Sequence, residues 1–125
     1  YVYTAFVRDT VRGCDPAWVR ELYSFAVMPD LTFLFKADLE VSLGRILSGR
    51  SELKFFEAGM DLRLAPTREE SFRIFQGKML DKYMELSEEF GFTVIDANLT
   101  IEEQQSQVRK LLIDHLDLEK FALPK

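Results

Sequence analysis

The sequence is poor in the residues that build disulfide-rich or metal-dependent domains. Among its 125 residues there is one cysteine, Cys14, and one histidine, His115. A single cysteine excludes an internal disulfide and a cysteine-rich zinc site, so we expect a reducing compartment and a cytoplasmic protein. His115 has no second histidine to share a metal ion with, and we therefore predict no metal site on these residues.

Long apolar runs and a surplus of positive charge are also lacking. No run approaches the roughly 20 apolar residues that a membrane span needs, which predicts no association with a membrane. The formal net charge is −5, whereas a general nucleic-acid binder normally carries a basic surplus, so we do not expect nucleic acid as a partner. A small anionic substrate stays compatible with this charge, because a few well-placed Arg or Lys side chains suffice to bind it.

The sequence is rich in apolar and aromatic residues. Hydrophobic residues make up 47%, and eleven residues are Phe, which excludes a disordered tail. The length suits one domain. The first residue is Tyr1 rather than Met, and no signal-peptide pattern follows, so we expect residues 1–125 to be part of a longer chain.

Apolar spacing and capping residues predict five helices and two strands, and Thr100 with Glu103 forms a capping-box pattern at the start of the last helix. In the fourth helix, Phe72, Phe75 and Met79 lie on one face, and we expect this apolar stripe to belong to the core. The predicted helices cover residues 3–12, the segment from Asp15-Pro16 to Pro29, and residues 38–49, 67–91 and 100–116. Leu31–Phe35 and Phe92–Ile95 are short apolar runs, typical of strands that are buried on both faces. Residues 50–66 have no steady period and are interpreted as a loop or lid.

Strands separated by helices indicate an α/β fold with a parallel sheet. Two fully apolar strands need further neighbours and helices on both faces. We therefore interpret the chain as part of a doubly wound parallel sheet, of which two strands and the flanking helices are visible. This predicts that the two strands lie parallel and adjacent or nearly so.

Four local patterns follow one another at characteristic spacing. They are Pro29-Asp30-Leu31-Thr32, the segment 38–46 (DLEVSLGRI), Phe56-Glu57 at the end of the lid, and Val94-Ile95-Asp96-Ala97. In this order they resemble the thymidylate kinases, a branch of the P-loop nucleoside monophosphate kinases, over essentially all 125 residues. The resemblance implies a P-loop kinase-like fold, with residues 1–125 as the C-terminal part of a single nucleotide-kinase domain and a lid at about 50–66.

The resemblance further implies phosphorylation of dTMP to dTDP with ATP and Mg²⁺, the Mg²⁺ being held mainly by a part of the family's domain that precedes these residues. The family's phosphate-binding loop has the form G-x-x-x-x-G-K-[ST], which does not occur here: Gly77-Lys78 is followed by Met79. That loop supplies backbone N–H groups and a Lys to the phosphates. We therefore expect these 125 residues alone to be inactive.

The resemblance also assigns roles to individual residues. It places catalytic cations at Arg50 and Lys54, ATP-binding residues at Arg45, Asp96, Ala97 and Asn98, and acceptor-nucleotide-binding residues at Tyr1, Thr4, Arg8, Phe56 and Glu57. Each has a simpler alternative: the cations can be solvated, Phe56 can belong to the core, and Asp96 can cap a turn. The lid departs from the family's usual ending, because it has Phe55-Phe56-Glu57 where an Arg commonly stands first.

Two other functions stay open at this point. One is a degenerate kinase-like module with an interaction or regulatory role, and the other is a kinase of a different nucleoside monophosphate. Which monophosphate is the acceptor cannot be read from the residues. The family is usually dimeric, and Trp18, Leu22 and Phe25 can supply a homodimer contact or belong to the core. We also predict that the lid is the most mobile internal segment in the absence of nucleotide.

Overall fold

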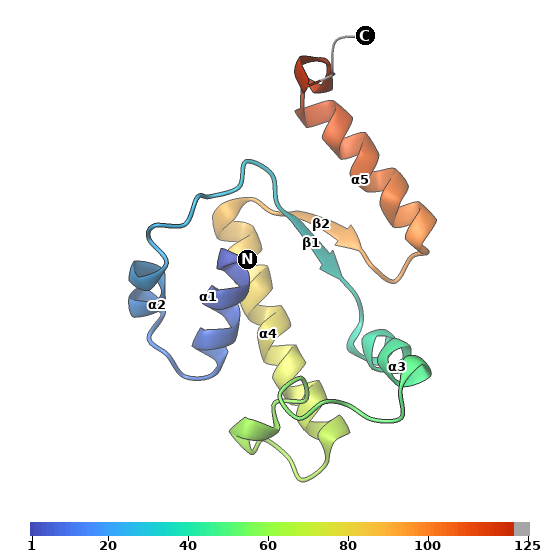
Figure 1. The fold of residues 1–125 in the computed structure, drawn as a ribbon. Helices are drawn as coiled ribbons and strands as arrows, with labels where there is room; N and C mark the ends of the chain where they lie inside the picture. The colour runs from blue at the N-terminus through green and yellow to red at the C-terminus, as the bar shows by residue number, and fades with distance from the viewer. Residues whose placement is uncertain (122–125) are drawn as a thin grey trace.

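A computed structural model describes residues 1–121 (Figure 1). The helices are α1 (Val2–Val11), α2 (Pro16–Leu22), α3 (Leu39–Gly49), α4 (Arg68–Phe90) and α5 (Ile101–His115), the strands are β1 (Phe33–Lys36) and β2 (Thr93–Asp96), and the short 3₁₀ helices are η1 (Met60–Leu62) and η2 (Leu118–Phe121). This order confirms the α/β class. No helix within residues 1–121 is both long enough and apolar enough to cross a membrane.

Strands β1 and β2 form a parallel pair, as predicted. Phe33 lies opposite Thr93, and Lys36 lies opposite Asp96. A parallel pair needs a long crossover connection, and here α3, the following loop and α4 provide it. The carboxyl ends of both strands therefore meet at one edge of the sheet (Figure 1).

The prediction that both strands are buried on both faces is wrong for the described residues. Only Ile95 is buried within the two strands, whereas Phe35 and Val94 are 48% and 42% exposed. The reason is the size of the sheet: over residues 1–121 it has two strands, so each strand has one neighbour and one open edge.

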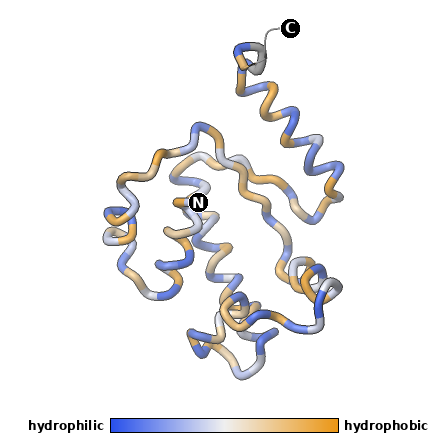
Figure 2. The backbone as a smooth tube through the Cα atoms, viewed as in Figure 1, coloured by the Kyte–Doolittle hydropathy of each residue, from blue (hydrophilic) through white to orange (hydrophobic). Residues whose placement is uncertain are grey.

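Helix α4 is the long central element of the fold, and α1 and α3 both pack against it (Figure 1). It begins at Thr67, whose side chain accepts a hydrogen bond from the backbone N–H of Glu70, and it ends at Gly91, whose φ of 67° closes the helix in the left-handed conformation. Both ends agree with the prediction. Hydrophilic and hydrophobic residues alternate along this helix in Figure 2, as expected of an amphipathic helix.

Two hydrophobic clusters lie along α4. One joins α1, α2 and α4 and consists of Val2, Phe6, Val7, Val19 and Leu86; the other joins α3, the loop and α4 and consists of Leu43, Leu53, Ala58 and Phe72. The predicted apolar stripe of α4 is thus core. Leu53 and Ala58 belong to the predicted lid, so the middle of that segment is packed, and its predicted mobility stays a prediction.

Helix α2 ends at Leu22 and does not continue to Pro29 as predicted. The chain turns there, because the backbone N–H of Ser24 bonds to the carbonyl of Glu21 and that of Ala26 to the carbonyl of Tyr23. The Tyr23 ring packs against Phe6, with ring centroids 6.5 Å apart. This contact with the core replaces the continued helix.

The predicted apolar face of this segment is exposed. Trp18, Leu22 and Phe25 are 54%, 48% and 75% exposed, so the interpretation of this face as core is wrong within the described chain. A homodimer contact through the same face stays a prediction.

Helix α5 starts with the predicted capping box. The Thr100 hydroxyl accepts from the backbone N–H of Glu103, and the Glu103 carboxylate accepts from the backbone N–H of Thr100. The helix contacts β2 and extends away from the other elements (Figure 1), and none of its described side chains is buried.

The turn at Gly59 provides a test of this packing. Gly59 has a φ of 68°, and a Cβ there would lie 2.5 Å from Cγ of the buried Phe75. We expect Gly59→Ala to lower the free energy of unfolding by about 2 kcal/mol or more, through left-handed strain and overpacking. Gly44→Ala is the matched control, because a Cβ at Gly44, inside α3, meets nothing within 4 Å. It should stabilise by up to about 1 kcal/mol, as measured by urea denaturation; equal effects of the two changes would contradict the packing.

Candidate functional site

A hollow of about 490 Å³ lies between α1 and the loop that follows α3. Its lining residues come from α1, the segment after α2 and the loop, and they are Tyr1, Thr4, Ala5, Arg8, Asp9, Arg12, Tyr23, Phe56 and Asp61. Tyr1, Thr4 and Arg8 share one helical face because they are three and four residues apart. Four of the five residues predicted to bind the acceptor thus line one hollow, which we call the α1 hollow.

The α1 hollow combines aromatic rings with charged groups. Tyr1 and Phe56 are 84% and 63% exposed, so their rings are free to contact a ligand. The Tyr83 hydroxyl donates to the Thr4 hydroxyl over 3.3 Å and orients it. Arg8 and Asp9 add a cation and an anion. A planar base and an anionic group can both be accommodated by such a lining.

Arg12 is a lining residue that the sequence analysis missed. Its Nε donates to Asp61 over 3.1 Å, and its Nη2 donates to the carbonyl of Phe56 over 3.3 Å. Its guanidinium also lies over the Phe75 ring, 4.7 Å from the centroid. The signal in the sequence was the spacing of four residues from Arg8 to Arg12, which puts both on one face of α1.

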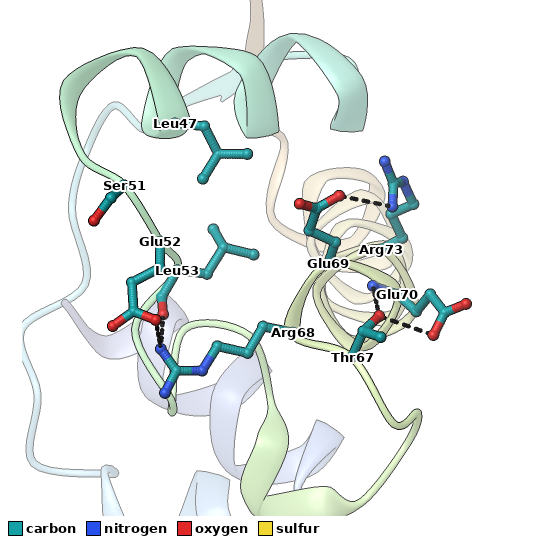
Figure 3. A pocket seen from close by; sticks show the side chains of 9 residues that line it. All are labelled: Leu47, Ser51, Glu52, Leu53, Thr67, Arg68, Glu69, Glu70 and Arg73. Carbon is teal, nitrogen blue, oxygen red and sulfur yellow. Dashed lines mark hydrogen bonds and ion pairs between the residues drawn. The ribbon is translucent and has the colours of Figure 1, made fainter.

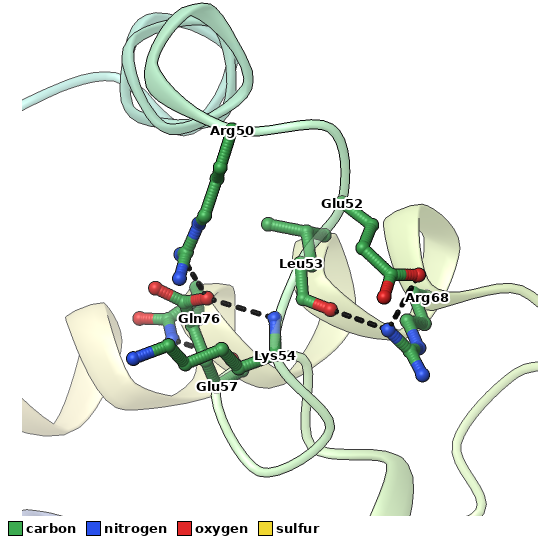
Figure 4. Close-up of polar contacts among 7 residues, drawn as sticks. All are labelled: Arg50, Glu52, Leu53, Lys54, Glu57, Arg68 and Gln76. Atoms are coloured by element: carbon green, nitrogen blue, oxygen red, sulfur yellow. Dashed lines mark hydrogen bonds and ion pairs between the residues drawn. The ribbon is translucent and has the colours of Figure 1, made fainter.

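Glu57, the fifth predicted acceptor residue, does not line the α1 hollow. Its carboxylate forms an ion pair with Arg50 and accepts a hydrogen bond from the backbone N–H of Lys54 over 3.1 Å (Figure 4). Its carbonyl accepts from the Gln76 side chain on α4 over 3.0 Å. Glu57 therefore organises the loop in the described structure.

The pKa of Glu57 reflects these contacts. Partial burial alone would raise the pKa of this carboxyl. The hydrogen bonds from the Arg50 side chain and the Lys54 backbone, together with the positive charges of Arg50 and Lys54, outweigh burial, so the pKa is lowered. The two predicted catalytic cations therefore lie beside one carboxylate. Arg50 is engaged through its side chain, whereas the contact from Lys54 uses its backbone, and Lys54 is exposed.

The four residues predicted to bind ATP meet at the carboxyl ends of the strands. Arg45 on α3 donates to the carbonyls of Ala97 over 2.6 Å and Asn98 over 3.3 Å. The Asn98 side chain accepts from the backbone N–H of Asp38 over 2.9 Å, and the Asn98 N–H donates to the Asp96 carboxylate over 2.9 Å. Asp96 thus caps the turn after β2, as the simpler alternative proposed.

A hollow of about 320 Å³ adjoins this cluster and includes Lys36, Asp38, Val94, Asp96 and Asn98 among its lining. Lys36 is exposed at the end of β1 and forms no ion pair within the described part of the chain. Ligands of open parallel sheets bind outside the carboxyl ends of the strands. That rule was the signal that could have identified Lys36 from the sequence.

A larger hollow, of about 620 Å³, separates the end of α3 from the start of α4 (Figure 3). Its two cations are already engaged: Arg68 pairs with Glu52 and donates to the carbonyl of Leu53, and Arg73 pairs with Glu40 and Glu69. None of the predicted site residues lines it. Size alone therefore does not identify a functional site, and most of the residues predicted to bind nucleotide line the other two hollows described above.

The described residues do not form a metal centre. Over residues 1–121 no three His, Cys, Asp or Glu side chains are placed to hold a metal ion together.

The Arg50–Glu57 pair predicts how Glu57 titrates. Because the folded-state pKa is lowered, the stabilisation from this pair is present above the ordinary pKa of Glu and is lost as the pH falls through the lowered value. In an NMR titration of the side-chain carboxyl, Glu57 should have a midpoint below the ordinary pKa of a Glu side chain. Arg50→Gln should raise the midpoint, and the control Lys54→Gln should raise it less, because the Lys54 hydrogen bond comes from the backbone. An equal rise in both variants would contradict the assigned contacts.

Curated relatives of this chain are named thymidylate kinases. A probable thymidylate kinase 2 of Saccharolobus solfataricus is 38% identical over 118 residues, which are 94% of this chain and 55% of that protein. Probable thymidylate kinases of Methanocaldococcus jannaschii and Thermococcus kodakarensis are 28% and 27% identical, over 86% and 90% of this chain and 48% of each relative. The chain spans about half the length of the curated relatives it matches. No family model matches the sequence. This similarity, which extends over most of the chain, is consistent with membership of the thymidylate kinase family.

Proposed function

We propose that these residues form the acceptor-side and adenine-side parts of a nucleotide kinase that transfers the γ-phosphoryl group of ATP to dTMP and so produces dTDP. The single observation that carries the proposal is the α1 hollow, in which Tyr1, Thr4, Arg8 and Phe56 come together. Relatives that are named thymidylate kinases support the same activity.

On the acceptor side, the α1 hollow has the size of a small-molecule site. The exposed rings of Tyr1 and Phe56 would pack against the base, and the Arg8 guanidinium would pair with the phosphate. The Thr4 hydroxyl, held by Tyr83, would orient the nucleotide through a hydrogen bond. These contacts would position the acceptor, which is the largest part of catalysis in a reaction of this kind.

On the donor side, the cluster around Arg45 would receive the adenine of ATP. The Arg45 guanidinium holds the backbone of Ala97 and Asn98 and can also present its plane to a base. Once released from Glu57, Arg50 would offset the negative charge that spreads over the transferring phosphoryl group, and Lys54 would add a second positive charge. Mg²⁺ would supply further charge neutralisation together with the ATP phosphates.

A second function has an observation in its favour. The sequence contains no G-x-x-x-x-G-K-[ST] motif, and Arg50 is occupied by Glu57, which fits a kinase-like interaction or regulatory module. A kinase of another nucleoside monophosphate would use the same hollow with a different base.

The proposed kinase is also expected to be cytoplasmic and to form a homodimer through the exposed side chains of Trp18, Leu22 and Phe25.

An activity assay tests the proposed function. The full-length protein that contains these residues should phosphorylate dTMP with ATP and Mg²⁺ when it is offered a panel of nucleoside monophosphates. The 125-residue chain alone should show no detectable turnover, because it lacks the motif that holds the β- and γ-phosphates. Turnover of a different monophosphate would change the assigned acceptor, and no turnover of any would favour the regulatory module.

Substitution of Arg45 tests the donor side. Arg45→Ala in the full-length protein should raise the KM for ATP about tenfold and leave kcat almost unchanged, because contacts to the adenine side are similar in the ground and transition states. Arg109→Ala is the control, since Arg109 lies on α5 and bonds to the carbonyl of Gln105 in the same helix. A fall in kcat with an unchanged KM for ATP would contradict this role of Arg45.

A further inference from the structure

Arg12 joins helix α1 to the loop at two separate points. Its guanidinium donates to the Asp61 carboxylate and to the Phe56 carbonyl, so it spans the loop from residue 56 to residue 61. The side chains of Arg12 and Asp61 are 22% and 24% exposed. This pair is therefore partly shielded from solvent, unlike the more exposed pairs of α2, α3 and α4.

The ring of Phe75, on α4, packs against the same loop segment, residues 56–61. Arg12 lies over this ring, and the backbone of Gly59 approaches it so closely that a Cβ would overlap it. The loop is thus held at Phe56 and Asp61 by Arg12 and at Gly59 by Phe75. Phe56 and Asp61 both line the α1 hollow, so these contacts fix one wall of the proposed acceptor site.

We propose that Arg12 is a positioning residue that sets the affinity for the acceptor nucleotide by holding this wall against α1. The inference rests on the proposed function of the α1 hollow. Loss of the Arg12 contacts would release the Phe56 backbone, and with it the exposed ring that would pack on the base. The affinity for ATP does not depend on this wall, because the Arg45 cluster lies at the carboxyl edge of the sheet.

The role requires the guanidinium itself. One Arg side chain donates through Nε and Nη2 in a fixed planar geometry while its flat face lies on an aromatic ring. A Lys has a single ammonium group and cannot make these three contacts together. Arg12→Lys should therefore recover only a part of the function that Arg12→Ala loses.

Arg12 also lines the hollow, so a direct contact with the nucleotide is the competing explanation. The two explanations differ in how Arg12 and Asp61 combine. If Arg12 positions the loop, Asp61 acts through Arg12, so the double variant should bind no worse than Arg12→Ala alone, and Asp61→Ala should have a smaller effect because Arg12 keeps its contacts with Phe56 and Phe75. If Arg12 instead contacts the nucleotide directly, Arg12→Ala should weaken nucleotide binding, whereas Asp61→Ala should leave it almost unchanged.

A double-mutant cycle in the full-length protein tests the proposal, with dTMP as the probe and isothermal titration calorimetry as the measurement. Arg12→Ala should weaken dTMP binding about tenfold, Asp61→Ala should weaken it about threefold, and the double variant should weaken it no more than Arg12→Ala does. The Kd for ATP should stay within about twofold in all three variants, which also reports that they are folded. Amide hydrogen exchange of residues 56–61 should accelerate in Arg12→Ala.

Arg20→Ala is the matched control. Arg20 also pairs with a carboxylate, that of Glu89, and also lies over aromatic rings, those of Phe6 and Phe90, but it does not line the α1 hollow. The Kd of the Arg20→Ala variant for dTMP should stay within about twofold of the Kd of the unchanged protein.

Failure of the inference and failure of the proposed function give different results. If the unchanged protein binds dTMP and Arg12→Ala binds it equally well, or if Asp61→Ala is silent, the positioning role of Arg12 is overturned and the acceptor site stands. If the unchanged protein binds no nucleoside monophosphate, the proposed function of the hollow fails, and the role of Arg12 in binding fails with it.

Discussion

The parallel pairing of β1 with β2 is the constraint on which the rest of the structure depends. Two parallel strands cannot be joined by a tight turn, so the chain must travel from one end of the sheet to the other between them. Here that path takes residues 37–92 through α3, the loop and α4. Because both strands then run in the same direction, their carboxyl ends meet, and the residues that follow each strand become neighbours.

The cluster around Arg45 forms because these carboxyl ends lie side by side. Asp38 follows β1 and Asn98 follows β2, and the Asn98 side chain accepts the N–H of Asp38. Arg45, two turns into α3, then reaches back to the carbonyls after β2. None of these contacts joins residues close in sequence, since they bridge separations of 52 to 60 residues. These contacts form because the parallel pairing of β1 with β2 brings the segments that follow the two strands together in space.

Signals that act over a few residues made the fold largely predictable from the sequence. The Thr100–Glu103 capping box, the Gly91 helix end and the apolar stripe of α4 each depend on neighbours within one or two turns, and each prediction is confirmed. The end of α2 was predicted wrongly because it depends on the packing of Tyr23 against Phe6, which is a tertiary contact.

The candidate site was predictable to the extent that its residues share an element. Tyr1, Thr4 and Arg8 follow from helical spacing, and the approach of Phe56 followed only from the resemblance. Arg12 was missed because its partners, Phe56 and Asp61, lie 44 and 49 residues away. An Arg on a helix looks the same in the sequence whether it is solvated or bonded to a distant loop.

The loop after α3 is held on two sides by two arginines that have different consequences. Arg12 caps the C-terminal end of α1, and its contacts with Phe56 and Asp61 maintain the wall of the α1 hollow. Arg50 lies at the base of the loop, and its pair with Glu57 satisfies a partly buried carboxylate. The same guanidinium cannot serve Glu57 and a phosphoryl group at full strength, since each contact uses its donors and its charge. If Arg50 leaves Glu57 for a phosphoryl group, Glu57 keeps only its hydrogen bond from the Lys54 N–H. The attraction between Arg50 and the phosphoryl group must therefore exceed the free energy lost with the ion pair, so the pair with Glu57 is favoured until a strongly anionic ligand binds.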